Sequence, residues 1–265
     1  MFLLARNPFY FIEFTTNLDW MQENTMVQNP FVHSTPPQIS GYDIHFATRQ
    51  EESGGGDIID YFKFRPLYYA FVLADVMGKE TKAKFFAYSF IGYLRGLLYP
   101  MIMDDQEISP SMLISRLSQL VDIDPFLQDV FITILSIQFD FENHSFTYTN
   151  AGCMPTLFFD AGKEKIIELN VGGGIPAFSF SDYEQDSMMC KPADVLCVCS
   201  DGVTEAKDDQ NNMLGLDAIK NFLADNSHLS SIEMAEGLFR TVDTHTGNQQ
   251  NHDDLSVLIV KREKA

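Results

Sequence analysis

The stretch Phe71-Val-Leu-Ala-Asp75 is a short apolar run with an aspartate at one end, and three other stretches also have an aspartate at one end of an apolar run. They are Asp57-Ile-Ile-Asp60-Tyr-Phe, Val195-Leu-Cys-Val-Cys-Ser-Asp201-Gly and Asp253-Asp254-Leu-Ser-Val-Leu-Ile-Val260. The β-branched and aromatic content of each stretch predicts a strand. The acid precedes the first and last of these strands along the chain and follows the middle two. Antiparallel pairing would therefore bring all four acids to one rim of a sheet.

Four aspartates at these strand ends form the candidate site, namely Asp57, Asp75, Asp201 and Asp253. A lone aspartate at a strand end is common because the residue favours turns, so the prediction depends on all four together. Carboxylates forced together repel one another unless a cation neutralises them. A set of oxygen ligands suits a hard cation such as Mg²⁺ or Mn²⁺, and neighbouring glycines allow the backbone to turn sharply. The pattern favours a metal-dependent hydrolase.

The composition argues against several other functions. The chain has 265 residues, of which 45% are hydrophobic, and a net charge of -19. Nucleic acids and anionic membranes attract basic surfaces, so neither is expected as a partner. The chain has no apolar run of about 18 residues and no clear signal for cleavage, so we expect a cytoplasmic protein. Four cysteines without a Cys-x-x-Cys pair are typical of buried thiols, although one disulfide stays open.

Hydrophobic periodicity predicts a short N-terminal segment, residues 1–35, and one domain, residues 36–265. The N-terminal segment is expected to hold a short helix that begins near Thr15-Thr16-Asn17 and ends before Asn29-Pro30. In the domain, helices are predicted near residues 79–101, 109–120, 214–224 and 231–245. Strands are predicted near residues 43–48, 58–65, 68–75, 131–141, 145–150, 156–159, 165–169, 183–190, 195–200 and 255–261.

Two local patterns suggest how some of these strands pair. Residues 130–170 have the pattern of a β-meander, and residues 183–190 and 195–200 that of a further strand pair. Many antiparallel strands, with helices in separate blocks, predict an α+β layered domain in which helices cover a sandwich of sheets.

Five segments occur in an order that resembles a known family. They are Ser53-Gly-Gly-Gly-Asp57-Ile-Ile-Asp60, Ala74-Asp75-Val-Met-Gly78-Lys79, Asn150-Ala151-Gly152-Cys-Met-Pro155, Ser200-Asp201-Gly202-Val-Thr-Glu205-Ala206 and Asp253-Asp254-Leu-Ser256-Val. The chain resembles the SpoIIE/RsbU-type serine phosphatases, a bacterial branch of the metal-dependent PPM protein phosphatases, over residues 36–262. This resemblance implies a four-layer sandwich of two antiparallel sheets with helices on the outer sides. It also implies two Mn²⁺ or Mg²⁺ ions at one end.

The resemblance also implies a role for each ligand. Asp75 would bridge the two metals, and the carbonyl of Val76 would bind the second. Asp201 and Asp253 would bind the first metal, and Asp57 would lie on the side of the second, directly or through water.

Three further acids lie close in sequence to the predicted ligands. Asp253 is preferred to Asp254 because the family ligand is the first residue of that pair. Asp60 and Glu205 are candidates to orient waters or backbone around the metals, and Glu205 is equally well explained as a residue that faces solvent.

The implied reaction is the hydrolysis of phosphoserine or phosphothreonine by a water that the two metals ionise. The implied partner is a phosphorylated protein, and the resemblance points to an anti-sigma-factor antagonist. An alternative is a pseudophosphatase that binds a partner without turnover, and a third is a hydrolase of small phosphoesters. A homodimer through the N-terminal segment is a further expectation.

Two departures from the family pattern leave room for the pseudophosphatase. Glu80 stands where the family has glycine, and Cys153 stands where it has histidine. Cys153 marks either the loss of a group that aids substrate binding or a buried position that accepts cysteine. His252, just before the acidic pair, is either a proton donor or phosphate ligand, or an exposed loop residue.

Overall fold

The structure is a computed structural model that describes residues 35–50, 55–77, 80–125, 127, 130–169, 183–247 and 253–264. The predicted N-terminal helix lies outside these residues, and the domain boundary near residue 35 stays a prediction. The described part of the chain has two five-stranded antiparallel sheets. Sheet A has the strand order β1 (Tyr42–Arg49), β10 (Leu255–Arg262), β9 (Val195–Cys199), β6 (Leu157–Asp160) and β7 (Lys165–Glu168). Sheet B has the order β2 (Asp57–Arg65), β3 (Tyr68–Val76), β4 (Ile132–Asp140), β5 (Ser145–Ala151) and β8 (Asp186–Met189).

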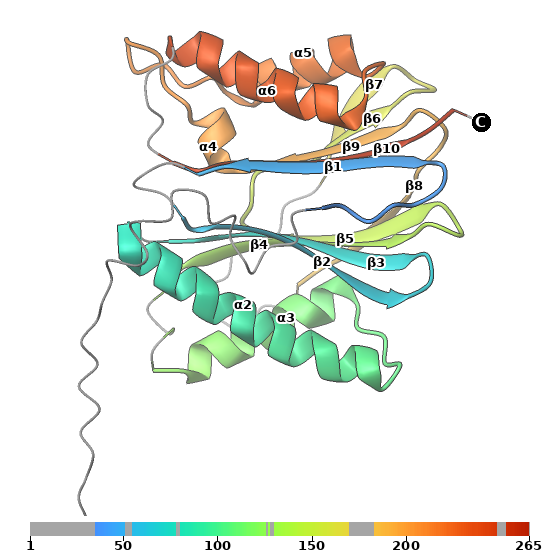
Figure 1. Cartoon of the computed structure of the whole chain (residues 1–265), viewed down its shortest axis with the longest axis vertical. Helices are drawn as coiled ribbons and strands as arrows, with labels where there is room; N and C mark the ends of the chain where they lie inside the picture. The colour runs from blue at the N-terminus through green and yellow to red at the C-terminus, as the bar shows by residue number, and fades with distance from the viewer. Residues whose placement is uncertain are drawn as a thin grey trace, which may run out of the picture. The chain divides into compact units, whose positions relative to one another are not determined.

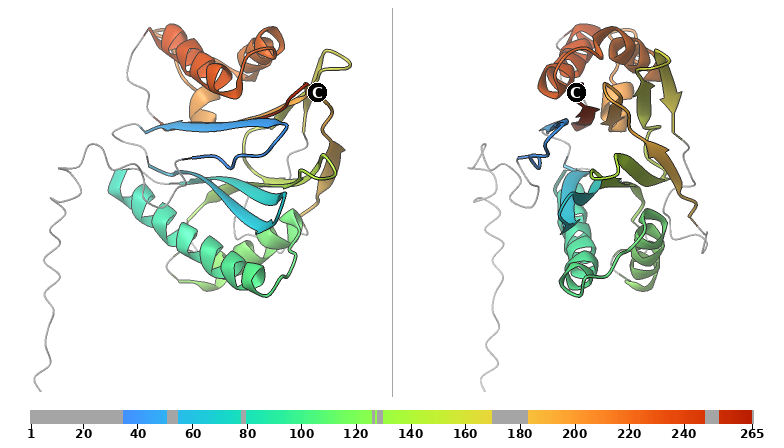
Figure 2. Two further views of the ribbon diagram at one scale, coloured as in Figure 1. Left: turned by 45° about the vertical axis from the view of Figure 1, so that its right-hand side comes forward. Right: turned by 90° about the vertical axis from the view of Figure 1, so that its right-hand side faces the viewer.

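The helices form the two outer layers of a four-layer sandwich (Figure 1). The helices α2 (Glu80–Met103) and α3 (Pro110–Ile123) cover sheet B. On sheet A lie α4 (Asp201–Thr204), α5 (Leu216–Asn226) and α6 (Ser231–Thr246). The views in Figure 2 show the same order of layers. The predicted α+β class with two packed antiparallel sheets is confirmed.

Three hydrophobic cores separate the four layers, and β3 shows why its sequence is apolar throughout. Phe71 and Leu73 of β3 face sheet A across the central core. Val72 and Ala74 point the other way, into the core beneath α2 and α3. Since successive side chains of a strand alternate between faces, a strand buried on both sides reads as a continuous apolar run. The third core lies between sheet A and the helices α4, α5 and α6.

Local capping explains where the outer helices begin. Ser109 caps α3, with its hydroxyl accepting a hydrogen bond from the N–H of Met112, and Pro110 opens the helix as predicted. Ser230 and Glu233 form a reciprocal capping box at the start of α6. No helix in the described ranges has both the length and the apolar character that crossing a membrane requires.

The strands themselves are present, but the meander prediction was right only for two hairpins, and the predicted pairing of residues 183–190 with 195–200 was wrong. Within residues 130–170, β4 pairs with β5 in sheet B, whereas β6 pairs with β7 in sheet A, so the meander is broken where the chain changes sheets. The strands β8 and β9 do not pair with each other, because β8 lies beside β5 and β9 lies between β10 and β6. Turn residues predict where strands end, but not which sheet the next strand joins.

Candidate metal centre

The four predicted aspartates lie at one end of the sandwich, but they come from two sheets. Asp57 is the first residue of β2 and pairs directly with Asp75 of β3, in sheet B. Asp201 begins α4 after β9, and Asp253 precedes β10, both in the layers of sheet A. Because β10 contacts β2 across the central core, these strand ends approach one another (Figure 1). The prediction of a single rim is corrected to two facing rims.

Strand alternation directs the side chains of Asp57 and Asp75 into the space between the sheets. On β2, Ile59 belongs to the central core, and on β3, Leu73 does so. Residues two positions apart share a face, so Asp57 and Asp75 face this space as well. Asp57 is 6% exposed. A pair of opposed carboxyls is therefore set into the end of the central core.

Asp60 faces the opposite way, and its geometry does not support the expected role in orienting waters at the site. It is 1% exposed and lies on the helix-facing side of β2. Its Oδ2 accepts hydrogen bonds from Nε and Nη2 of Arg95 in α2, at 3.2 and 2.8 Å. A buried ion pair is costly to break because one charge is left uncompensated. Asp60 therefore anchors α2 on sheet B.

Two glycines let the backbones around the acids approach closely. A Cβ built on Gly56 would lie 2.6 Å from the carbonyl oxygen of Val76 and 2.7 Å from Oδ1 of Asp75. A Cβ on Gly202 would lie 2.1 Å from the carbonyl oxygen of Asp254. Side chains do not tolerate such contacts, so both positions require glycine. Two predicted ligand atoms, from Asp75 and Val76, thus lie within reach of one point beside Gly56.

Burial and the charges of neighbouring acids raise the pKa values of three of the four aspartates, Asp57, Asp75 and Asp201. Burial is the largest cause for Asp75, and the charges of Asp201 and Asp253 follow, so that its pKa rises to about 7. Burial raises the pKa of Asp57 well above its ordinary value, and the charge of Asp75 adds to this effect. The pKa of Asp201 is raised by burial and then by Asp253. The four acids therefore share one electrostatic neighbourhood.

The donor set fits a hard divalent cation. Oδ2 of Asp57 is buried and accepts no hydrogen bond of ordinary geometry from the described residues, although the hydroxyls of Ser256 and Ser200 lie near enough to the carboxyl to lower its pKa. An ionised oxygen in that position is costly, and a bound cation would satisfy it. Within the described ranges, however, no three His, Cys, Asp or Glu side chains lie close enough to hold one ion together. The ligand set of Asp57, Asp75, Val76, Asp201 and Asp253 therefore stays a prediction.

Sequence reasoning missed the structural role of Asp254. Its Oδ2 accepts a hydrogen bond of 2.6 Å from the N–H of Gly55, and the residue is buried. The hydroxyl of Ser200 donates to the carbonyl oxygen of Asp254 at 3.2 Å and accepts from the N–H of Ser256 at 3.0 Å. These bonds join the start of β10 to the entry of β2 and the end of β9. The sequence Asp254-Leu-Ser256 could have indicated this role, because two polar residues flank an apolar residue that the structure buries, Leu255.

Cys153 is a buried structural residue beside the acids. Its N–H donates to Oδ1 of Asn150 at 2.9 Å, and its thiol donates to Oγ1 of Thr133 at 3.5 Å. Burial raises the pKa of the Cys153 thiol to about 12, and Asp75 adds to this, so the thiol stays protonated near neutral pH. This supports a buried position that accepts cysteine. All four cysteines are buried and free.

Other predicted neighbours are resolved in part. Glu205 is exposed and ends α4, where its N–H donates to the carbonyl oxygen of Asp201 at 2.7 Å. The charge of the Glu205 side chain contributes to the raised pKa of Asp201. Gly78, Lys79, His252 and the side chain of Glu80 lie outside the described residues.

The raised pKa values predict how the stability of the metal-free protein depends on pH. Between pH 4 and 7 the folded state holds a proton on Asp75 that the unfolded state has released, since the pKa of this carboxyl is about 7 against 3.8, and the raised pKa of Asp57 acts in the same direction. Stability should therefore fall as pH rises through this range, by at most about 1.4 kcal/mol per pH unit for each group. Urea unfolding in EDTA at pH 5.5 and 7.5 measures this.

Two further measurements isolate the carboxyl groups as the cause. An Asp75→Asn variant should show a flatter dependence, because its amide does not titrate. Added Mn²⁺ should restore stability at pH 7.5 in the natural chain, by binding the folded state. Higher stability of the EDTA-treated natural chain at pH 7.5 than at pH 5.5 would contradict the predicted repulsion.

The comparisons with known proteins agree on one family. The family model for Stage II sporulation protein E (SpoIIE) matches residues 66–263. The chain is 24% identical over 239 residues to phosphoserine phosphatase RsbU of Bacillus subtilis, which covers 89% of this chain and 68% of RsbU. It is 20% identical over 266 residues to Protein IcfG of Synechocystis sp.. That match covers 91% of this chain but 41% of IcfG, so the chain spans less than half of that relative.

Solved structures share the fold. The SiaA-PP2C domain of Pseudomonas aeruginosa has a TM-score of 0.69 at 15% identity, over 84% of this chain and 86% of that one. RsbX in complex with magnesium has a TM-score of 0.57 at 15% identity, over 85% of this chain and 97% of that one. The catalytic domain of PstP with two manganese ions has a TM-score of 0.56 at 14% identity, over 84% of this chain and all of that one. The chain belongs to the SpoIIE family of metal-dependent, PP2C-type (PPM) serine phosphatases.

Proposed function

We propose that this chain hydrolyses phosphoserine or phosphothreonine in a phosphorylated protein. One observation carries the proposal: the carboxyls of Asp57, Asp75 and Asp201 come from two sheets, are buried or half-buried, and have pKa values raised by burial and by neighbouring acids. Bound protons relieve this repulsion in the metal-free protein, and a cation between the acids would relieve it at neutral pH. RsbX and PstP, two solved structures of this fold, are described with magnesium and with two manganese ions.

We assign two Mn²⁺ or Mg²⁺ ions to the end of the central core. Asp75 would contact both ions, Asp201 and Asp253 would hold one, and the carbonyl of Val76 and the carboxylate of Asp57 would lie beside the other. When bound, the ions supply a water ionised near neutral pH and positive charge for the phosphate oxygens. Gly56 and Gly202 would help to position the ligand residues, because glycine has no side chain that would keep the neighbouring backbone segments apart.

The finer proposal for the substrate is a phosphorylated anti-sigma-factor antagonist. It is supported by the family resemblance and by the match to a relative named phosphoserine phosphatase RsbU. A pseudophosphatase that binds a partner without turnover is the second candidate, and Cys153 does not decide between the two, because its burial and its bonds to Asn150 and Thr133 are those of a structural residue.

Mn²⁺ titration with two substrates tests the proposal. We expect Mn²⁺ to bind, and both para-nitrophenyl phosphate and a phosphoserine peptide to be hydrolysed in its presence but not in EDTA. Calorimetry measures binding, and phosphate release measures turnover. Bound Mn²⁺ without turnover of either substrate would refute the enzyme and favour the partner-binding module. Turnover of para-nitrophenyl phosphate alone would favour a hydrolase of small phosphoesters.

A further inference from the structure

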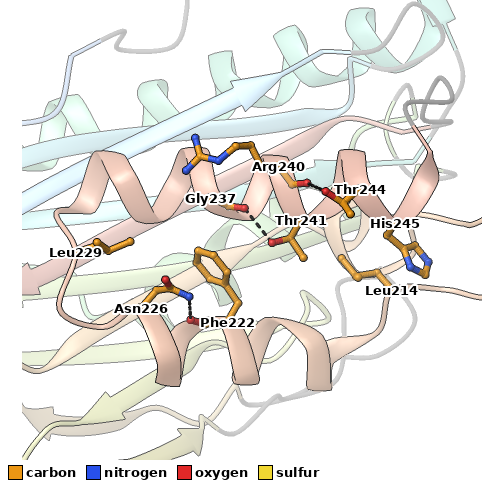
Figure 3. A pocket seen from close by; sticks show the side chains of 9 residues that line it. All are labelled: Leu214, Phe222, Asn226, Leu229, Gly237, Arg240, Thr241, Thr244 and His245. Carbon is orange, nitrogen blue, oxygen red and sulfur yellow. Dashed lines mark hydrogen bonds between the residues drawn. The ribbon is translucent and has the colours of Figure 1, made fainter.

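The helices α5 and α6 leave a groove of about 520 Å³ between them (Figure 3). Three half-buried apolar side chains line it, from Leu214, Phe222 and Leu229. The groove faces away from the central core, because both helices cover the outer side of sheet A. A groove of this size with partly exposed apolar residues is typical of a site that binds a ligand or a peptide.

Small residues on α6 create this groove. Gly237, Thr241 and Thr244 recur at helical spacing on the face turned toward α5 (Figure 3). The ring of Phe222 packs against Gly237, where an added Cβ would lie 2.5 Å from Cζ of Phe222. The hydroxyls of Thr241 and Thr244 donate to carbonyl oxygens of their own helix, at 2.9 and 2.8 Å. The threonine hydroxyls are thus already bonded, and the groove offers mainly apolar contacts.

The charge at the groove is unusual for this chain. The net charge of the whole sequence is -19, yet none of the described lining residues is acidic, and Arg240 is the charged residue among them. The ion pair of Arg240 with Glu236 is 3.5 Å long, and the two side chains are 66% and 62% exposed. Such a pair contributes little, so a ligand carboxylate can replace Glu236. The groove therefore favours an apolar ligand with a negative charge.

One end of the groove is connected to the short helix α4 by a backbone hydrogen bond. Leu214 lines this end, and His245, near the C-terminus of α6, contacts the carbonyl oxygen of Asn212 at 2.9 Å. The following residue, Gly215, donates its N–H to the carbonyl oxygen of Thr204 in α4 at 2.8 Å. The helix α4 contacts α6 and begins with Asp201. A polypeptide in the groove is thus placed beside the short helix that carries a predicted metal ligand.

We propose that the groove between α5 and α6 docks an acidic, amphipathic segment of the phosphoprotein substrate. An aromatic or aliphatic side chain of that segment packs on Phe222 and Leu229, and a carboxylate pairs with Arg240. The identity of this partner rests on the proposed phosphatase function, whereas the binding chemistry rests on the groove alone. Docking at a distance from the reacting group supplies binding energy that the small phosphoserine site lacks.

Selection from a random 12-residue peptide library tests the binding chemistry without any catalytic step. The full chain is the target, and Thr241→Glu, which puts a carboxylate into the groove, is the counter-target. Enriched peptides should combine aromatic or leucine residues with Asp or Glu. Enrichment of basic peptides, or of none that distinguishes the two proteins, would overturn the proposal. If the groove instead binds a second copy of this chain, the selection should yield no such peptides. Sedimentation velocity should then show a dimer that the Thr241→Glu variant no longer forms.

Matched variants locate the bound peptide. Fluorescence polarisation with the best selected peptide should show at least tenfold weaker binding to Thr241→Glu and Arg240→Glu. Thr241→Val keeps the shape of the groove without adding a charge, and Arg116→Glu makes the second change on the exposed face of α3. Both controls should bind within about twofold of the natural chain, and thermal unfolding should confirm that all variants fold. Equal loss in the controls would refute docking in the groove.

Kinetics then decide whether the docked segment belongs to a substrate. The selected peptide is joined by a flexible linker to a phosphoserine peptide. Its KM should fall at least tenfold relative to the peptide without the extension, with kcat unchanged, and Arg240→Glu should remove the gain. The natural chain and the Arg240→Glu variant should hydrolyse para-nitrophenyl phosphate at equal rates, because this small substrate has no segment that could dock. Unchanged KM despite peptide binding would refute substrate docking, while absence of all turnover would refute the proposed function and leave the binding result standing.

Discussion

Asp75→Asn should abolish phosphatase activity while the protein stays folded. We expect turnover of a phosphoserine peptide in Mn²⁺ to fall at least about a thousand-fold, equivalent to about 4 kcal/mol of transition-state stabilisation. The charges of Asp201, Asp253 and Asp254 all raise the pKa of Asp75, so this carboxyl interacts with more of the neighbouring acids than Asp57 or Asp201 does. An amide keeps its size but loses the charge that would hold two ions.

The same variant should make the metal-free protein more stable at neutral pH. Removing the charge of Asp75 relieves the repulsion that adds to burial in raising the pKa of Asp57. Urea unfolding in EDTA at pH 7.5 measures this gain, and calorimetry with Mn²⁺ measures the loss of binding. The exposed Asp209→Asn serves as control and should change neither property. An Asp75→Asn protein that is both active and less stable would contradict the predicted metal centre.

The strands and helices could be predicted because local chemistry determines them. The run Phe71-Val-Leu-Ala has one conformation that buries every side chain, and Ser109-Pro110 marks a helix start wherever it is placed. The assignment of strands to sheets could not be predicted in the same way. The strand β9 is buried on both faces, so no polar side identifies its neighbours. Contacts between distant segments placed β8 in one sheet and β9 in the other.

The convergence of the acids was predicted from strand direction, but the orientation of two of them was not. Asp57 and Asp60 are three residues apart, so alternation places them on opposite faces of β2. Ile59 lies in the central core, so the face of β2 that also carries Asp57 is the one that holds the site. The burial of Asp254 likewise depends on Gly55, which is distant in the sequence.

Gly202→Ala should disrupt the site by forcing two backbones apart. The added methyl group would lie 2.1 Å from the carbonyl oxygen of Asp254 and 3.3 Å from Cβ of Asp253. Both obstacles belong to the main chain or lie close to it, so no rotation of a flexible side chain relieves the clash. Overpacking of this kind costs about 2–4 kcal/mol. The start of α4 must move away from the entry to β10.

This movement links stability to metal binding, because Gly202 lies between two predicted ligands. Asp201 is its chain neighbour, and Asp253 lies across the contact. Separating them should weaken Mn²⁺ binding at least about tenfold, equivalent to about 1.4 kcal/mol. Activity at limiting Mn²⁺ should fall in parallel and recover in part when Mn²⁺ is raised. Calorimetry and urea unfolding of the same preparation give both quantities.

Gly96→Ala provides a matched control with the opposite sign. Gly96 lies in the interior of α2, and a Cβ built there meets no atom within 4 Å. Alanine should therefore stabilise the helix by about 0.5–1 kcal/mol through its higher propensity, with no change in Mn²⁺ binding. If Gly202→Ala behaved like Gly96→Ala in both measurements, the close approach of α4 to Asp254 would not be a feature of the folded protein. Comparing the two variants thus distinguishes the lack of space for a side chain at Gly202 from the general cost of glycine in a helix, which Gly96 represents.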